Sequence, residues 1–169
     1  TLRRELPKHG VDTQGLMLQL EPGRSMHGDA GIHLTTVRNI KRLESPIRWK
    51  LVIVDTTEFW FTGGRYEHHL HDYVFANKTD APLVDKADII GRSCYGDRLI
   101  PTVSIPEVEV GDILALLDTG AYQEVSMSNF NAIPRPATVL VTGDRAAIVR
   151  RRETEEDVLR RDVIPEHLR

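Results

Sequence analysis

The sequence predicts a mainly β fold, and two observations support this prediction. Short apolar runs recur along the 169 residues, separated by glycine, proline, asparagine or aspartate, which are the residues that favour turns between strands. No long helical pattern lies between these runs, so an antiparallel barrel or sandwich is expected rather than an α/β domain. The expected strands cover residues 15–22, 30–40, 49–57, 71–78, 87–94, 112–118 and 137–151.

Two segments have helical character. The first covers about residues 1–9 and is short. The second, ETEEDVLRRDVI at 153–164, has acidic residues early and arginines later, which is the order that a helix dipole favours. The sequence therefore predicts a short C-terminal helix.

The overall composition is that of a single globular domain, with 40% hydrophobic and 28% charged residues. A net charge of −3 provides no excess of cations for nucleic acid. The single cysteine cannot form an internal disulfide, and no apolar stretch reaches the roughly 18 residues that a bilayer requires. The chain begins with a polar stretch and without methionine. We therefore expect a cytoplasmic protein, present as a fragment or a processed product, that binds neither nucleic acid nor membrane.

The sequence HHLH places three histidines together, at His68, His69 and His71. On a strand, His69 and His71 share a face, and two imidazoles on one face are able to bind zinc, iron or nickel. The neighbouring carboxylate Asp72 would lie on the opposite face. A polar strand end or binding surface is therefore favoured, and a metal site is kept as an alternative.

Three further features are ambiguous from the residues alone. Cys94 follows an apolar run and is flanked by turn-forming residues, and a lone cysteine is usually a small hydrophobic residue of the core. In EPGRSMHGDAG, Gly23 allows a ligand to approach the backbone and Arg24 is able to clamp a carboxylate or phosphate, although a surface turn explains the same residues. The polar, aromatic and proline-rich end of 111–136 is long for a simple connection.

Four motifs, taken in order, are similar to a known family. They are EPGR at 21–24, GRSCYGDRL at 91–99, VGDILALLDTGAY at 110–122 and SMSNFNAIPRPATVLV at 126–141. Their order and spacing resemble the C-terminal part of the fold-type III decarboxylases that depend on pyridoxal phosphate (PLP), which include diaminopimelate, ornithine and arginine decarboxylases. The closing VRRRETEEDVL at 149–159 also matches.

The resemblance implies a two-part enzyme, in which an N-terminal (β/α)8 barrel holds PLP. By this likeness, residues 1–29 are the last barrel strand with its EPGR turn, and residues 30–169 are a Greek-key-like β-barrel or sandwich domain. The family forms head-to-tail dimers, and the cysteine loop of one subunit enters the barrel of the other. The implied partners are a barrel segment that carries the PLP lysine, a second subunit in a homodimer or heteromer, and a small amino-acid substrate.

The same resemblance implies roles for single residues. Cys94 matches the residue that protonates the substrate after CO₂ has left, and a thiol suits this task because it is mostly protonated near neutral pH yet releases its proton readily. Tyr122 matches a tyrosine that contacts both cofactor and substrate, and Arg24 also faces the substrate. The implied cofactor contacts are Glu21, Pro22, Gly23, Arg24 and Tyr122.

Two departures from the family pattern concern the substrate. Relatives follow the cysteine with glutamate or aspartate to hold a distal ammonium, but Tyr95 follows Cys94 here, and a neutral phenol cannot balance that charge unless Asp97 does so. Upstream, Arg65 matches an arginine that grips a distal carboxylate, whereas His69 stands where a tyrosine is expected. We therefore expect a substrate other than a standard diamino acid. The implied substrate contacts are Arg24, Arg65, His69, Tyr95, Asp97 and Tyr122.

A PLP enzyme also needs a lysine that binds the cofactor as a Schiff base. The lysines here are Lys8, Lys41, Lys50, Lys78 and Lys86, and none has the strand context that the family uses. The predicted function is the C-terminal segment of a PLP-dependent carboxy-lyase whose lysine comes from another segment. Two alternatives stay open: a non-catalytic β-module that dimerises or regulates, and a jelly roll that binds metal at His69 and His71.

Overall fold

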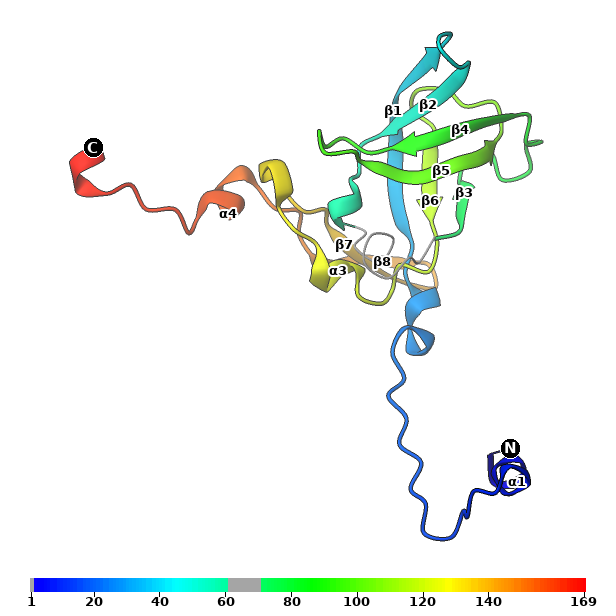
Figure 1. The fold of residues 1–169 in the computed structure, drawn as a ribbon. Coiled ribbons are helices and arrows are strands. Elements are labelled where there is room, and N and C mark those ends of the chain that lie inside the picture. Colours follow the sequence, from blue (N-terminus) through cyan, green and yellow to red (C-terminus); the bar gives the residue numbers. More distant parts are fainter. Residues whose placement is uncertain (1, 61–70) are drawn as a thin grey trace.

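The computed structural model describes residues 2–60 and 71–169, and its centre is a six-stranded sheet (Figure 1). The strand order is β3-β6-β1-β2-β4-β5, and β7 and β8 form a separate two-stranded sheet. The strands are β1 His33–Leu43, β2 Trp49–Val54, β3 Tyr73–Phe75, β4 Asp85–Ile90, β5 Arg98–Ile105, β6 Ile113–Leu116, β7 Thr138–Thr142 and β8 Arg145–Arg150. The mainly β prediction is thus confirmed.

One strand pair departs from the antiparallel expectation. β2 pairs with β4 in parallel, with Leu51 opposite Asp88, whereas the other neighbouring pairs are antiparallel. Parallel neighbours need a crossover of a dozen or more residues, and the connection from residue 55 to residue 84 is long enough to provide one. The sheet is therefore mixed.

The helices are short. They are α1 Leu2–Glu5, η1 Leu6–His9, η2 Arg24–Met26, η3 Gly28–Ala30, η4 Glu58–Trp60, α3 Gln123–Ser126, η5 Phe130–Ala132, α4 Glu155–Leu159 and η6 Glu166–Leu168. The helix expected over 153–164 is reduced to α4, which begins with a capping box between Thr154 and Asp157. Within the described ranges, no helix is long and apolar enough to cross a bilayer.

The hydrophobic core lies on one side of the curled sheet and draws on most of its strands. Buried positions alternate in β1, at Thr35 and Val37, and in β2, at Val52 and Val54. Val37 pairs with Val54, and both are fully buried. The buried cluster consists of Val37, Val52, Val54, Trp60, Phe75, Ala87, Ile89, Ile100, Val103, Ile105, Val108, Leu114, Leu116 and Ile133. This core holds fixed the strand ends from which the loops described below emerge.

Strand β5 was missed from the sequence because Pro101 interrupts its pattern. Proline is tolerated in edge strands, and β5 is the outer strand of the sheet. The pairing with β4 is irregular around Asp88, and Thr102 has a positive φ of 52°. The Asp88 carboxylate accepts a hydrogen bond from the Thr102 backbone N–H at 2.8 Å, so this side chain replaces a bond that the irregular strand pair does not make.

The strand expected at 15–22 is wrong. Residues 16–23 form no regular element and run away from the sheet (Figure 1). Leu16, Met17, Leu18 and Leu20 are 58%, 88%, 65% and 73% exposed. A strand needs a neighbour for its backbone N–H and C=O groups, and the described residues supply none to this apolar run.

Two other strand predictions needed new boundaries. The strand expected over 137–151 is a hairpin of β7 and β8 that turns at Gly143, which has a positive φ of 59°. The strand expected over 87–94 ends at Ile90. Cys94 therefore lies in the turn that follows β4, and it is exposed.

Candidate functional site

The EPGR and GAY motifs meet in space although about 100 residues separate them in the chain. Gly120 N–H donates to Gly28 O at 2.8 Å, and Thr119 N–H donates to Gly31 O at 2.9 Å. A Cβ on Gly120 would lie 2.1 Å from His27 O, and a Cβ on Gly31 would lie 2.4 Å from Gly120 N. Two backbones therefore touch where only glycine fits. We call residues 23–31 together with 119–122 the glycine end.

Tyr122 is held over the EPGR turn. A Cβ on Gly23 would come 2.1 Å from the Tyr122 hydroxyl oxygen, so the missing side chain leaves the space that the phenol fills. The Arg24 guanidinium carbon lies 5.2 Å from the centre of the Tyr122 ring, within the range of a cation–π contact, and Arg24 Nη1 donates to Ala121 O at 3.4 Å. The structure thus brings together three residues that the sequence singled out.

The backbone of Tyr122 is strained. Its φ is 70°, a left-handed value that costs a bulky residue on the order of 1–3 kcal/mol and often marks a functional site. The Tyr122 carbonyl accepts hydrogen bonds from Ser126 N–H at 3.1 Å and Ser126 Oγ–H at 2.6 Å. The short helix α3 therefore starts directly from this strained residue.

The remaining residues of the EPGR motif are exposed. Glu21 and Pro22 lie on the surface, and Gln19 Nε2 is 3.5 Å from Glu21 Oε1. Their implied contact with cofactor stays a prediction.

Asp97 organises the loop that carries Cys94. Its side chain is only 3% exposed, and its carboxylate accepts hydrogen bonds from Glu58 N–H at 2.6 Å and Ser93 N–H at 2.7 Å. A Cβ on Gly91 would lie 2.3 Å from Asp97 Oδ2. These contacts give Asp97 a structural role, and its implied contact with substrate stays a prediction.

An aromatic cluster covers the same loop. Phe59 and Phe130 are stacked with ring centres 4.0 Å apart, and Tyr95 lies against both, 6.3 Å from Phe59 and 6.0 Å from Phe130. Tyr95 therefore has a packing role, although it is 58% exposed. Asn131, which is in a left-handed conformation with φ 59°, donates from Nδ2 to Cys94 Sγ at 3.3 Å. We call residues 91–97 together with 128–133 the cysteine end.

A partly buried ion pair between Arg135 and Glu153 fixes the segment behind the cysteine end. Glu153 accepts hydrogen bonds from Asn129 Nδ2, from Arg135 Nε at 2.8 Å and from Arg135 N–H at 2.8 Å. The Arg135 guanidinium in particular lowers the pKa of Glu153 to about 2. The residues just before β7 and just after β8 are thereby tied to the loop that contains Phe130 and Asn131.

His71 is the one member of the histidine cluster within the described residues, because His68 and His69 lie outside them. It is buried, with Nδ1 at 2.8 Å from Leu117 O and Nε2 at 2.8 Å from Gln123 Nε2. In the part of the chain that the structure describes, no group of three metal-binding side chains occurs. Arg65 also lies outside the described residues, so its implied role, like that of His69, stays a prediction.

His33, which begins β1, is held neutral near physiological pH. Burial lowers its pKa to about 4, and the partly opposing charge of Asp55 does not reverse this shift. Its ring lies 6.3 Å from that of Trp60. This histidine therefore belongs to the packing that supports the glycine end.

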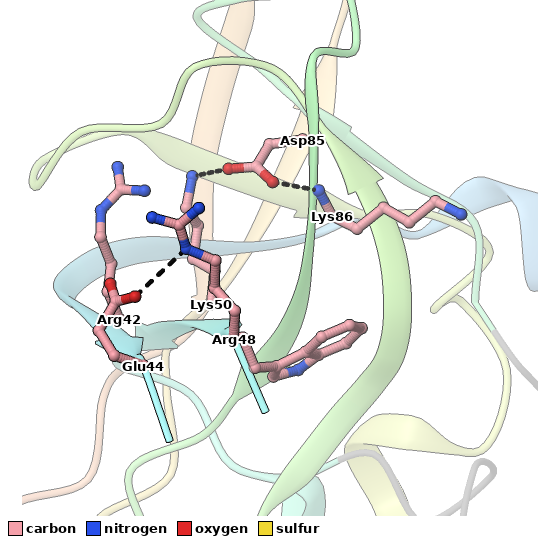
Figure 2. A pocket seen from close by; sticks show the side chains of 7 residues that line it. Arg42, Glu44, Arg48, Lys50, Asp85 and Lys86 are labelled. Atoms are coloured by element: carbon pink, nitrogen blue, oxygen red, sulfur yellow. Dashed lines mark hydrogen bonds and ion pairs between the residues drawn. The ribbon is translucent and has the colours of Figure 1, made fainter. Parts of the chain in front are cut away.

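A groove lies at the other end of β1 from the glycine end. This open groove of about 400 Å³ is lined by Arg42, Glu44, Arg48, Trp49, Lys50, Asp85 and Lys86. Figure 2 shows Lys50 bonded to Asp85, Arg48 bonded to Glu44, and the Lys86 side chain extended away from them. Because carboxylates already engage Lys50 and Arg48, this groove is a salt-bridged surface and a weaker candidate than the glycine end.

Several residues that hold the site in place were assigned no role by the sequence analysis. Phe59, Phe130, Asn131 and Gln123 received no role, although Phe130 and Asn131 lie inside a motif that was singled out. Alternating aromatic and amide residues in SNFNA were the available signal. The residues that they contact are 35 to 71 positions away in the chain, and no local pattern indicates such contacts.

Comparisons with known proteins agree with this geometry. The sequence pattern of a family described as pyridoxal-dependent decarboxylase, C-terminal sheet domain, matches residues 25–120. The diaminopimelate decarboxylase of Archaeoglobus fulgidus is 35% identical over 157 residues, which is 92% of this chain and 36% of that protein. The Bacillus subtilis enzyme of the same name is 34% identical over 171 residues, covering 96% of this chain and 36% of that protein.

Solved structures show the same relationship. A crystal structure of diaminopimelate decarboxylase from M. jannaschii matches 99% of this chain and 38% of its own, with a TM-score of 0.81 and 31% identity. A complex of that enzyme with L-lysine matches with a TM-score of 0.78 and 34% identity, covering 88% of this chain and 33% of the other. The chain thus spans about a third of the length of the relatives it matches. With the family pattern covering more than half of its residues, this chain belongs to the pyridoxal-dependent decarboxylases, as their C-terminal sheet domain.

Proposed function

We propose that this chain is the C-terminal part of a PLP-dependent diaminopimelate decarboxylase. The observation that carries the proposal is the contact of Gly23 and Arg24 with Tyr122, which joins two motifs of the family at one place. In this proposal residues 1–29 end a (β/α)8 barrel, residues 30–169 are the β-domain, and the cofactor lysine is carried by the barrel. The exposed apolar side chains of residues 16–20 support the first boundary, because a neighbouring barrel strand would cover them.

The relatives favour diaminopimelate as the substrate. The A. fulgidus and B. subtilis proteins carry that name, which counts against the expectation of a substrate other than a standard diamino acid. That expectation rested on Tyr95 and on His69, which lies outside the described residues. The contacts of Tyr95 with Phe59 and Phe130 give Tyr95 a packing role instead. The substitution after Cys94 therefore no longer requires an unusual substrate.

The residues of the glycine end suit the cofactor. The Tyr122 phenol occupies the space above Gly23, and a side chain at position 23 would exclude the phenol from it. The Tyr122 hydroxyl is a donor and the Arg24 guanidinium is a fixed cation, a combination that binds phosphate or carboxylate oxygens. When bound, PLP supplies the electron sink that makes loss of CO₂ possible. In this proposal Tyr122 and Arg24 orient the cofactor and the substrate.

We assign proton delivery to Cys94. Its thiol is exposed at the tip of a loop whose base is fixed by buried Asp97, and Asn131 donates to its sulfur. The Cys94 Sγ–H would give its proton to the substrate carbon from which CO₂ has departed. An exposed loop held this firmly suits insertion into the barrel of a second subunit, so the proposal includes a homodimer. A cytoplasmic location stays a prediction from the sequence.

The experiment joins this chain to the barrel part of a diaminopimelate decarboxylase relative and measures lysine formed from diaminopimelate. Cys94→Ala should lower turnover by about 100-fold or more, while the visible absorbance of bound PLP stays unchanged. Ser93→Ala is the matched control and should keep its turnover. Equal turnover in Cys94→Ala would refute the proton-delivery role, and decarboxylation of ornithine or arginine in place of diaminopimelate would refute the substrate assignment.

A further inference from the structure

We propose that His71 is a positioning residue for Tyr122. His71 is 9% exposed, lies just before the outer strand β3, and takes no part in the proposed chemistry. The inference rests on the proposed function only for the role of Tyr122, which is to orient the cofactor and the substrate. The contacts from which it is drawn lie within the described residues and do not depend on the cofactor.

The first step is the assignment of the two ring nitrogens. Leu117 O is a carbonyl and only accepts, so His71 Nδ1, at 2.8 Å, must carry a proton and donate. In the neutral ring Nε2 is then an acceptor, and Gln123 Nε2, also at 2.8 Å, donates to it. The ring therefore makes an oriented bridge from the end of β6 to Gln123.

The second step leads from Gln123 to Tyr122. Gln123 is 2% exposed and is the first residue of α3, directly after Tyr122 with its positive φ of 70°. A strained conformation persists only where its surroundings impose it. The neighbouring backbone is fixed on one side by the contacts of Gly120 and on the other side by the bridge from His71 to Gln123. The bridge thus fixes where the phenol stands over Gly23.

The orientation of the Gln123 amide shows how specific this bridge is. With its nitrogen turned towards His71, Gln123 Oε1 is buried and has no hydrogen-bond partner among the described residues. Leaving a buried acceptor unsatisfied is unfavourable, and rotating the amide would place its oxygen against the lone pair of His71 Nε2. The Gln123 side chain therefore leaves its Oε1 without a partner while its Nε2 bonds to His71.

The test uses two substitutions that each preserve one half of the bridge. Asparagine places an amide nitrogen where His71 Nδ1 lies, so His71→Asn keeps the bond to Leu117 and removes the acceptor for Gln123. Glutamine reaches the position of Nε2, so His71→Gln keeps an acceptor for Gln123. Gln123→Leu removes the same bond from the other side. Asp72→Asn is the matched control, because Asp72 contributes its backbone carbonyl to Leu117 N–H and its side chain is exposed.

The first measurement is NMR on the 169-residue chain. Nitrogen-15 spectra near neutral pH should show His71 as the neutral ring protonated at Nδ1. The cross-peak between the Tyr122 ring protons and the Gly23 α-protons should be present in the native chain, in His71→Gln and in Asp72→Asn. It should be lost in His71→Asn and in Gln123→Leu.

Several outcomes would overturn the proposal. These are a cross-peak that survives in both His71→Asn and Gln123→Leu, an equal loss in His71→Gln, and a native ring protonated at Nε2. The last measurement needs no substitution, so it decides the question even where a variant fails to fold. In the enzyme joined to a barrel, His71→Asn should lose PLP on dialysis faster than His71→Gln. A native assembly that binds no PLP would refute the proposed function and leave the NMR result standing.

Discussion

The glycine end and the cysteine end share one continuous segment, because residues 119–122 belong to the first and residues 128–133 to the second, yet the two ends are built differently. At the glycine end, backbone meets backbone, with Gly120 against His27 O and Gly31 against Gly120 N. At the cysteine end, side chains support the loop: the buried carboxylate of Asp97 and the stack of Phe59 on Phe130. The glycine end thus depends on the absence of side chains, and the cysteine end depends on the side chains of Asp97, Phe59 and Phe130.

This difference suggests how each end performs its proposed task. A residue that contacts the cofactor must be held in one fixed position. Gly23 allows the Tyr122 ring to pack directly on the EPGR turn without a side chain between them. A proton donor must instead reach outward, and the Asp97 carboxylate fixes the loop from beneath while Cys94 stays exposed. Substitutions should therefore act separately on the two ends, which can be tested.

The largest effect is expected for Asp97→Ala. Two partly buried backbone donors, at Glu58 and Ser93, would lose their acceptor, and each costs about 1–3 kcal/mol when left unsatisfied. We expect the free energy of unfolding to fall by about 4 kcal/mol in urea titrations. Reaction of the Cys94 thiol with a disulfide reagent should also change in rate.

Asp144→Asn is the control for Asp97→Ala, because Asp144 lies exposed in the turn of the β7–β8 hairpin. If the two ends are independent, the cross-peak between Tyr122 and Gly23 should persist in folded Asp97→Ala. Loss of that cross-peak with an unchanged thiol rate would contradict the comparison.

A somewhat smaller effect is expected for Gly120→Ala. The added Cβ would lie 2.1 Å from His27 O, a backbone atom that cannot move alone. Overpacking of this kind costs about 3 kcal/mol, and the Tyr122 cross-peak should disappear while the thiol rate of Cys94 stays the same. Gly10→Ala is the control: nothing lies within 4 Å of its added Cβ, so it adds only the strain of alanine at a φ of 75°, about 1–2 kcal/mol, and should leave the Tyr122 cross-peak in place. A stable Gly120→Ala chain with the cross-peak intact would show that the two backbones do not touch.

The smallest effect concerns the stability of the fold at low pH. The pKa of Glu153 lies at about 2 instead of 4.5, chiefly because of Arg135, so its ionised form stabilises the fold above about pH 4.5. That stabilisation is lost as the pH falls from about 4.5 through about 2. Glu153→Gln should reduce the free energy of unfolding by about 1 kcal/mol near neutral pH.

The difference between the native chain and Glu153→Gln should shrink as the pH is lowered through that window. Urea titrations at several pH values measure it, with Glu155→Gln, an exposed residue at the start of α4, as the control. A difference that stays constant with pH would mean that the pair of Glu153 and Arg135 does not stabilise the loop at the cysteine end.

Much of the fold followed from local patterns. Apolar runs correctly located β1, β2, β3, β4 and β6, because alternation along a strand is set by the sheet face that each side chain meets. Pro101 hid β5, since the pattern does not show that β5 lies at the edge of the sheet. The apolar run at 15–22 was predicted as a strand and has no strand partner among the residues that the structure describes.

The sequence by itself determined the strand-forming segments and the four motifs, because both depend on residue type and short spacing. Only the tertiary structure decided what those motifs touch: Tyr122 on Gly23, Asp97 beneath the loop of Cys94, Tyr95 against Phe130, and His71 on Gln123. Contacts between residues distant in the chain arise from how the sheet closes on its core. The alternation of apolar and polar residues indicates which face of a strand is buried, and it does not indicate which distant segment covers that face.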